Sequence, residues 1–150
     1  MTTVGAKPRY VVDTSVVLKW FVQSDEKDWQ PARELREAYV QKRCSVSCPE
    51  FLALELANAL KTGRKFTAAE INIIAESFRA LDIVLESLQW STLERAIDLA
   101  AAFGTAVYDS YFLASAIDSN SVLVTADELF IRKVGNHRHL LNLRQFGLTR

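Results

Sequence analysis

Short apolar runs alternate along this chain with longer segments in which apolar residues recur every three or four positions. The short runs predict strands that are buried on both faces, and the longer segments predict amphipathic helices. The expected strands are 11–12, 44–48, 82–85, 122–124 and 140–141, and the expected helices are 15–21, 29–40, 50–61, 67–78, 92–104, 105–118 and a short one after 127. This alternation predicts an α/β fold, a three-layer α/β/α domain with a central, mainly parallel sheet of four to five short strands.

Small polar residues at the predicted helix starts mark candidate caps. They are Thr14 or Ser15 for the first helix, Ser91 or Thr92 for the fifth and Thr105 for the sixth. Thr67 and Glu70 have the spacing of a capping box, in which each side chain bonds the backbone N–H of the other residue.

The 150 residues contain no internal repeat and no linker rich in Gly, Ser or Pro, so we expect a single domain over 1–150. Within it, residues 1–8 are expected to form a flexible N-terminal extension. No apolar run approaches the roughly 18 residues of a membrane span, and no apolar segment of a secretion signal follows the first residues. Two cysteines are too few for a disulfide framework. These features predict a cytoplasmic protein that does not enter a membrane.

Charge is balanced overall but unevenly distributed. The chain has 18 basic and 18 acidic residues, which argues weakly against nucleic-acid binding through bulk charge. No acid follows Glu128, whereas the remaining segment contains Arg132, Lys133, Arg138, Arg144 and Arg150 with His137 and His139. This basic segment is either a solvated tail or an edge that contacts phosphates, and the sequence leaves both readings open.

Two acids lie just beyond predicted strands. Asp13 directly follows 11–12, and Asp127 closely follows 122–124. Because the carboxyl ends of parallel strands share one edge of the sheet, where ligands of open α/β sheets bind, we expect both acids at that edge. Considered singly, either acid could simply cap the helix that follows it.

Two further acids interrupt the apolar faces of predicted helices. Glu55 shares a face with Phe51 and Leu52, and Asp109 lies on one stripe with Phe112. A carboxylate in such a position is costly unless its charge is compensated. Considered singly, Glu55 could pair with an Arg or Lys, and Asp109 could be a first-turn acid favoured by the helix dipole.

The coincidence of four such acids favours a shared cation. Clustered carboxylates repel one another and retain protons, and a divalent ion removes that cost. Donor sets made only of oxygen suit Mg²⁺ or Mn²⁺ rather than zinc. The nearby polar side chains that could orient the acids or hold metal-bound water are Thr14, Ser15, Asn58 and Thr125.

The acids and their neighbours form four motifs, which are VDTSV (12–16), ELANAL (55–60), YDSYFLA (108–114) and LVTAD (123–127). In order and spacing they resemble the motifs of PIN-domain ribonucleases, and specifically of the VapC toxins of toxin–antitoxin pairs. The resemblance covers the chain from Tyr10 to about Leu141. Ser110 and Ser115 stand where alanines are more usual around the third motif.

The resemblance implies a Mg²⁺-dependent endoribonuclease that inhibits translation when its antitoxin is lost. Asp13, Asp109 and Asp127, with Glu55 directly or through water, would hold one or two ions. A metal-activated water would then hydrolyse the phosphodiester bond and leave a 5′-phosphate and a 3′-hydroxyl. The implied partners are an RNA substrate, a cognate antitoxin, and a second copy of the chain in a homodimer, which would form a heterotetramer or larger assembly with the antitoxin. The RNA target, whether transfer, ribosomal or messenger RNA, stays open.

Other interpretations remain beside this one. A PIN-like module could bind RNA or protein without cutting, and a related nuclease could act on DNA. A receiver domain or a haloacid-dehalogenase-like phosphatase also places an Asp after a strand, but the phosphatases need a second Asp where this chain has Ser15. Cys44 and Cys48 could form a zinc site with His137 and His139, although their spacing is loose. Exposed aromatic residues could stack on bases, but the sequence does not say which are exposed.

Overall fold

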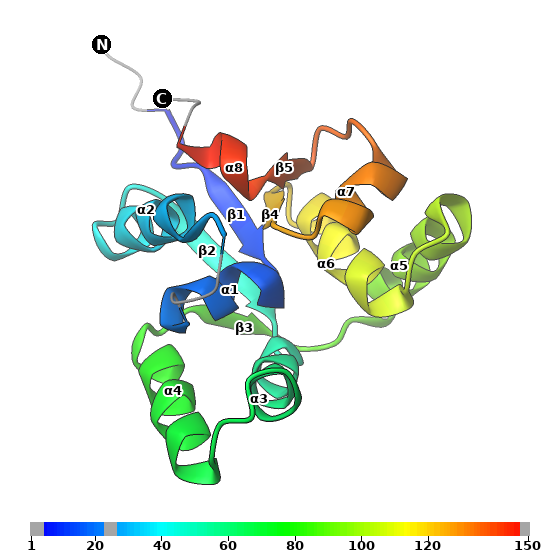
Figure 1. Ribbon diagram of the computed structural model, residues 1–150. Helices are drawn as coiled ribbons and strands as arrows, with labels where there is room; N and C mark the ends of the chain where they lie inside the picture. The colour runs from blue at the N-terminus through cyan, green and yellow to red at the C-terminus, as the bar shows by residue number, and fades with distance from the viewer. Residues whose placement is uncertain (1–4, 23–26, 148–150) are drawn as a thin grey trace.

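The computed structural model of the protein describes residues 5–22 and 27–147. Its strands are β1 (Arg9–Val12), β2 (Ser45–Pro49), β3 (Val84–Glu86), β4 (Val122–Thr125) and β5 (Leu140–Asn142). They form one sheet in the order β3-β2-β1-β4-β5, and each neighbouring pair is parallel. The expected parallel sheet is therefore confirmed, with β1 at its centre (Figure 1).

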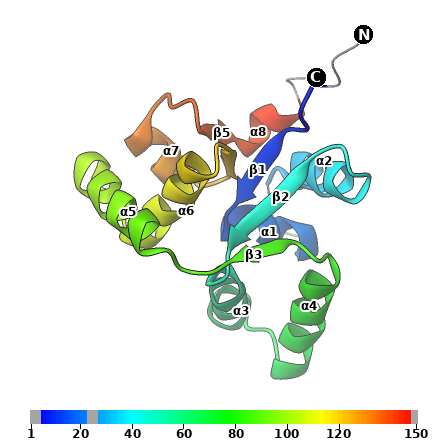
Figure 2. The ribbon, with the colours of Figure 1, turned by 180° about the vertical axis from the view of Figure 1, so that it is seen from behind.

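Helices connect successive strands, as parallel pairing requires. They are α1 (Thr14–Phe21), α2 (Trp29–Val40), α3 (Leu52–Thr62), α4 (Ala68–Ala80), α5 (Trp90–Phe103), α6 (Val107–Asp118), α7 (Glu128–Val134) and α8 (Leu143–Phe146). Helices α1, α2 and α8 pack together on one face of the sheet, and α6 packs on the other with α5 against it (Figures 1 and 2). This arrangement gives the predicted three layers.

The most buried elements are β1 and α6. Val11 and Val12 are completely buried, as expected for a central strand covered on both faces. Every residue of α6 from Ser110 to Ala116 is also buried, because this helix lies between the sheet and α5. Helices α3 and α4 instead form a hairpin that extends away from the β3 side of the sheet (Figures 1 and 2).

Several predicted element ends are wrong. The third strand begins at Val84 rather than at residue 82, because Asp82 has a left-handed φ of 54° that a strand cannot contain. Helix α3 begins at Leu52 rather than at residue 50. Helix α8 was not expected from the sequence. Of the expected extension 1–8, residues 1–4 lie outside the described residues, and Pro8 accepts a backbone hydrogen bond from Ser45.

Three of the expected helix caps are also wrong, because the side chains expected to cap these helices bond other side chains. Asp13 caps α1 by accepting a hydrogen bond from the backbone N–H of Val16. Gln89 and Ala106 precede α5 and α6 and make no side-chain cap. The residues that we expected to cap these helices bond side chains instead: Ser15 to Asp13, Thr92 to Asp118 and Thr105 to Ser110. The capping box of Thr67 and Glu70 is confirmed.

Candidate active site

Asp13 is held at the carboxyl end of β1 by hydroxyl groups on both of its oxygens. Ser15 donates to Oδ1 at 2.5 Å, and the backbone N–H of Val16 reaches the same oxygen at 3.3 Å. Thr125, at the end of β4, donates its hydroxyl to Oδ2. The carboxylate therefore joins two neighbouring strands, in which Val12 and Val124 are in register.

Thr125 also links Asp13 to Asp127. The backbone N–H of Asp127 donates to Thr125 Oγ1 at 3.1 Å, while the Asp127 side chain caps α7 through the N–H of Phe130 at 3.0 Å. Ser15 accepts a hydrogen bond from the N–H of Ala126 at 3.0 Å. The ends of β1 and β4 thus form one hydrogen-bonded unit that contains both acids, as the sheet topology predicted. The alternative reading is correct as well, because both acids cap helices.

Glu55 joins this unit from α3 through the residue that follows Asp13. Thr14 donates its hydroxyl to Glu55 Oε1 at 3.1 Å, across 41 residues of sequence. Glu55 is half-buried. It forms no ion pair among the described residues, so the expectation that an Arg or Lys would neutralise it is wrong.

Asp109 approaches from the first turn of α6, on the opposite face of the sheet from α1. It is half-buried, and its side chain forms no hydrogen bond with any residue that the structure describes. Burial, and then the charge of Asp127, raises the pKa of Asp109, whereas the charge of Lys133 lowers it. Asp109 therefore lies within reach of the charges at the end of β4.

The pKa values of three of these acids are raised. Burial raises the pKa of Asp13 to about 6, although the bonds from Ser15, Thr125 and Val16 oppose this and Asp127 adds repulsion. Burial first, and then the charge of Asp109, raises the pKa of Glu55, against the bond from Thr14. The charge of Asp127 acts on both Asp13 and Asp109, and the charge of Asp109 acts on Glu55. The four acids therefore share one region of negative charge.

The chemistry of this region fits a hard divalent cation. Its donors are carboxylate and hydroxyl oxygens, and none of the four carboxylates has an ion-pair partner in the described part of the chain. Yet among residues 5–22 and 27–147 no three Asp, Glu, His or Cys side chains already stand close enough to enclose a metal ion. The residues present fit the ion by type, and the acids would have to draw together around it.

The predicted supporting residues behave differently from one another. Ser15 and Thr125 bond Asp13, and Thr14 bonds Glu55. Asn58 is exposed one turn beyond Glu55 on α3, and its side chain bonds none of the acids. The structure therefore assembles the three hydroxyl residues with the carboxylates but does not bring in the amide.

The alternative zinc site is wrong. Cys44 and Cys48 are buried at β2, whereas His137 and His139 precede β5, and β1 and β4 separate these two strands in the sheet. Burial, with a contribution from Glu86, raises the pKa of Cys48 to about 12, so its thiol stays protonated. His139 is buried and bonds the carbonyl of Ser121 at 2.7 Å.

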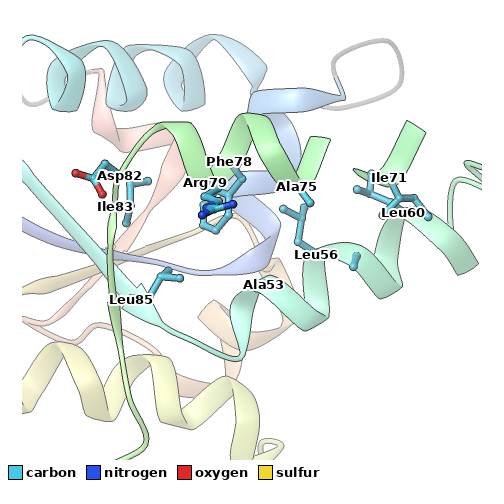
Figure 3. A pocket seen from close by; sticks show the side chains of 11 residues that line it. Ala53, Leu56, Leu60, Ile71, Ala75, Phe78, Arg79, Asp82, Ile83 and Leu85 are labelled. Atoms are coloured by element: carbon cyan, nitrogen blue, oxygen red, sulfur yellow. The ribbon is translucent and has the colours of Figure 1, made fainter. Parts of the chain in front are cut away.

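A separate apolar groove lies between α3 and α4. Its volume is about 320 Å³, and it reaches β3. Figure 3 shows side chains of α3 and α4 facing one another along it. The groove is lined by Ala53, Leu56, Ala57, Leu60, Ile71, Ala75, Phe78, Arg79, Asp82, Ile83 and Leu85. Phe78 is the only buried residue of α4, whose bounds fall entirely within the described residues, so the other apolar side chains of this helix are at least partly exposed.

Comparison with known proteins identifies the family. The model of the PIN domain matches residues 10–136, which include all four acids. The chain belongs to the PIN domain family. PIN domains are typically metal-dependent nucleases, which agrees with the oxygen donors gathered at the end of β1. None of the curated proteins matches the sequence.

Solved structures share the PIN fold with this chain. The crystal structure of PAE2754 from Pyrobaculum aerophilum has a TM-score of 0.63 at 17% identity, covering 95% of this chain and 97% of that one. A toxin–antitoxin complex from Klebsiella pneumoniae has a TM-score of 0.65 at 14% identity, covering 89% and 97%. FitAcB from Neisseria gonorrhoeae has a TM-score of 0.64 at 14% identity, covering 90% and 98%. At these identities the likeness establishes the fold.

None of the helices in the described part of the chain has the length and apolar character that a bilayer crossing requires.

Proposed function

We propose that this PIN domain is a Mg²⁺-dependent endoribonuclease and the toxin of a toxin–antitoxin pair, with Mn²⁺ as an alternative ion. The observation that carries the proposal is the joining of Asp13, Thr125 and Asp127 at the ends of β1 and β4, with Glu55 tied to the same turn by Thr14. Four acids that meet near the carboxyl edge of a parallel sheet, without an ion-pair partner among the described residues, support a metal-dependent reaction. The family match and the toxin–antitoxin name of one structural neighbour support the biological role.

In this proposal each acid has a defined task. Asp13 and Asp127 bind the ion from the strand ends, Asp109 binds it from α6, and Glu55 binds it directly or through water. A bound divalent ion supplies an activated water and neutralises charge on the phosphate. Ser15 and Thr125 hold the two Asp13 oxygens, which fixes the direction in which that carboxylate faces.

The raised pKa of Asp13 limits where this chemistry operates. With a pKa of about 6 in the metal-free protein, Asp13 is largely ionised at neutral pH and largely protonated near pH 5. Because an ion binds the carboxylate rather than the acid, metal and protons compete for Asp13. The proposed nuclease should therefore need a higher metal concentration as the pH falls.

The groove between α3 and α4 supports an antitoxin partner. Leu56 lines the groove and Glu55 lies on the same helix, so an apolar segment bound there would contact the helix that carries one of the acids. A basic residue carried by that segment could occupy the acidic region and compete with the metal for its carboxylates. We further propose that the chain works as a single cytoplasmic domain and a homodimer, which binds the antitoxin as a heterotetramer or larger assembly.

A cleavage assay tests the proposed function. Purified protein is incubated with total bacterial RNA in Mg²⁺, in Mg²⁺ with excess EDTA, and beside single-stranded DNA. We expect RNA cuts with 5′-phosphate ends in Mg²⁺ alone, and none with Asp109→Asn. Cleavage of DNA only would favour the related DNA nuclease. RNA binding without any cut would favour the non-catalytic module.

A further inference from the structure

An exposed aromatic ring stands next to the acids at the start of α6. Tyr108 directly precedes Asp109 and is 69% exposed, although the helix is buried from Ser110 onward. A single exposed tyrosine is ordinary on a protein surface. A second observation at the start of α6 is a lysine that contacts the turn leading into this helix.

That lysine is Lys133 of α7. Its ammonium group donates to the carbonyl of Gly104 at 2.9 Å, and Gly104 is the left-handed cap between α5 and α6, four residues before Tyr108. The charge of Lys133 also lowers the pKa of Asp109. The ammonium group therefore lies at the turn that leads into the first turn of α6.

Lys133 is suited to an anionic ligand because its partner is a neutral carbonyl. Arg144, in the same basic C-terminal segment, is instead paired with Asp28 at 2.9 Å and Glu128 at 2.8 Å. An RNA strand that reaches four carboxylates meets repulsion, and a cation beside Asp109 offsets part of it. Lys133 can provide that contact while Arg144 is already neutralised.

We propose that Tyr108 and Lys133 form a nucleotide subsite beside Asp109, in which the ring stacks on an unpaired base next to the scissile phosphate and the ammonium group contacts a neighbouring phosphate. This inference rests on the proposed function, because it takes RNA as the ligand. Stacking needs a base face that is free of its helical neighbours, so the subsite selects single-stranded RNA or a loop.

Trp90 provides a matched control for Tyr108. It is the first residue of α5, it is 79% exposed, and it lies at the other end of the α5–α6 pair. The bond of Thr92 to Asp118 fixes this placement, because it joins the start of α5 to the end of α6. Trp90 is thus as exposed and aromatic as Tyr108 but remote from Asp109.

The test uses a single-stranded 12-nucleotide RNA that spans a cleavage site mapped in total bacterial RNA. For Tyr108→Ala we expect KM to rise about tenfold with kcat within twofold, whereas Tyr108→Phe and Trp90→Ala keep wild-type values. An abasic substitution beside the scissile phosphate should raise KM for the wild type but not for Tyr108→Ala. These results together would show that the ring and that base interact.

Lys133 is tested by the salt dependence of KM. Lys133→Gln should reduce the slope of log KM against log salt by about 0.7, and Lys133→Arg should restore it. A merely structural role in holding Gly104 would change stability and leave the slope unchanged.

The two proposals fail in different ways. If wild-type protein cuts RNA and Tyr108→Ala has unchanged KM, or responds to the abasic series as the wild type does, the subsite is overturned and the nuclease stands. An equal loss in Trp90→Ala would also overturn the subsite. If the wild type cuts no RNA in Mg²⁺, the proposed function falls and the subsite falls with it.

Discussion

Thr125 donates its hydroxyl to Asp13 across two neighbouring strands, although 112 residues separate them in sequence. The same oxygen accepts the backbone N–H of Asp127, so one completely buried side chain orients both acids. A hydroxyl at this position stabilises the charged form of Asp13 and satisfies a backbone donor. The geometry of the candidate site therefore depends on a residue that carries no charge.

Replacing Thr125 by Val should weaken the site while preserving its shape. Asp13 loses a bond that lowers its pKa, so the acid limb of the pH–rate profile should move to higher pH, and activity at pH 6 should fall about tenfold. The control is Thr92→Val, which removes another buried hydroxyl, bonded to Asp118 at the opposite end of α6 from Asp109. Both variants should lose about 1–3 kcal/mol of stability, but only the first should change the pH profile.

The stability of the metal-free protein should depend on pH through the ionisation of Asp13. Folding raises the pKa of Asp13 from its ordinary 3.8 to about 6, so its contribution to stability is complete below pH 3.8 and is lost as the pH rises through 6. Asp13→Asn removes that loss, and Asn also caps helices well. Denaturant unfolding in EDTA should show that the free energy of unfolding of Asp13→Asn, relative to that of the wild type, rises by up to about 3 kcal/mol between pH 4 and pH 7. A constant difference across that range would mean that Asp13 is not perturbed.

Divalent metal should stabilise the wild type by relieving repulsion among the acids. At 100 times the dissociation constant the gain is about 2.7 kcal/mol, which for this chain length corresponds to a rise in Tm of about 5–10 °C. Thermal unfolding in millimolar Mg²⁺ or Mn²⁺ is compared with NaCl of equal ionic strength. The rise should be smaller at pH 5.5 than at pH 7.5, since protons compete for Asp13. An absence of any shift at pH 7.5 would count against a metal site in the free protein.

The groove predicts how an antitoxin is recognised. Ala75 is exposed on α4 and lines the groove, whereas Ala69 is exposed on the same helix and does not line it. Co-expression with the product of the adjacent reading frame should rescue cells from the wild type and from Ala69→Glu, but not from Ala75→Glu. Equal rescue in all three would place the antitoxin elsewhere.

The sequence predicts the sheet and the acids better than it predicts the details around them. The carboxyl ends of parallel strands must share an edge, so Asp13 and Asp127 could be placed together from the pattern alone. The convergence of Glu55 required a tertiary bond to Thr14, which no local pattern specifies. The caps expected of Ser15, Thr92 and Thr105 are wrong for a related reason, because these residues bond distant or neighbouring side chains that compete with capping.

Asn58 and Tyr108 show opposite limits of sequence reasoning. Asn58 has the right spacing from Glu55, yet it is exposed and bonds none of the acids. Tyr108 lies within a recognised motif, but only its exposure suggests a role beyond packing. Spacing along a helix gives the face on which a residue lies, whereas its exposure depends on which elements pack there.

The central claim is that acids from separate elements bind one divalent ion, and titration with Mn²⁺ followed by electron paramagnetic resonance tests it most directly. We predict saturable binding to the wild type, with affinity reduced at least tenfold in Asp13→Asn, Glu55→Gln and Asp109→Asn, each measured separately. Asp98→Asn, which changes an exposed acid of α5, should bind as the wild type does. Wild-type affinity in all three site variants would contradict the shared site.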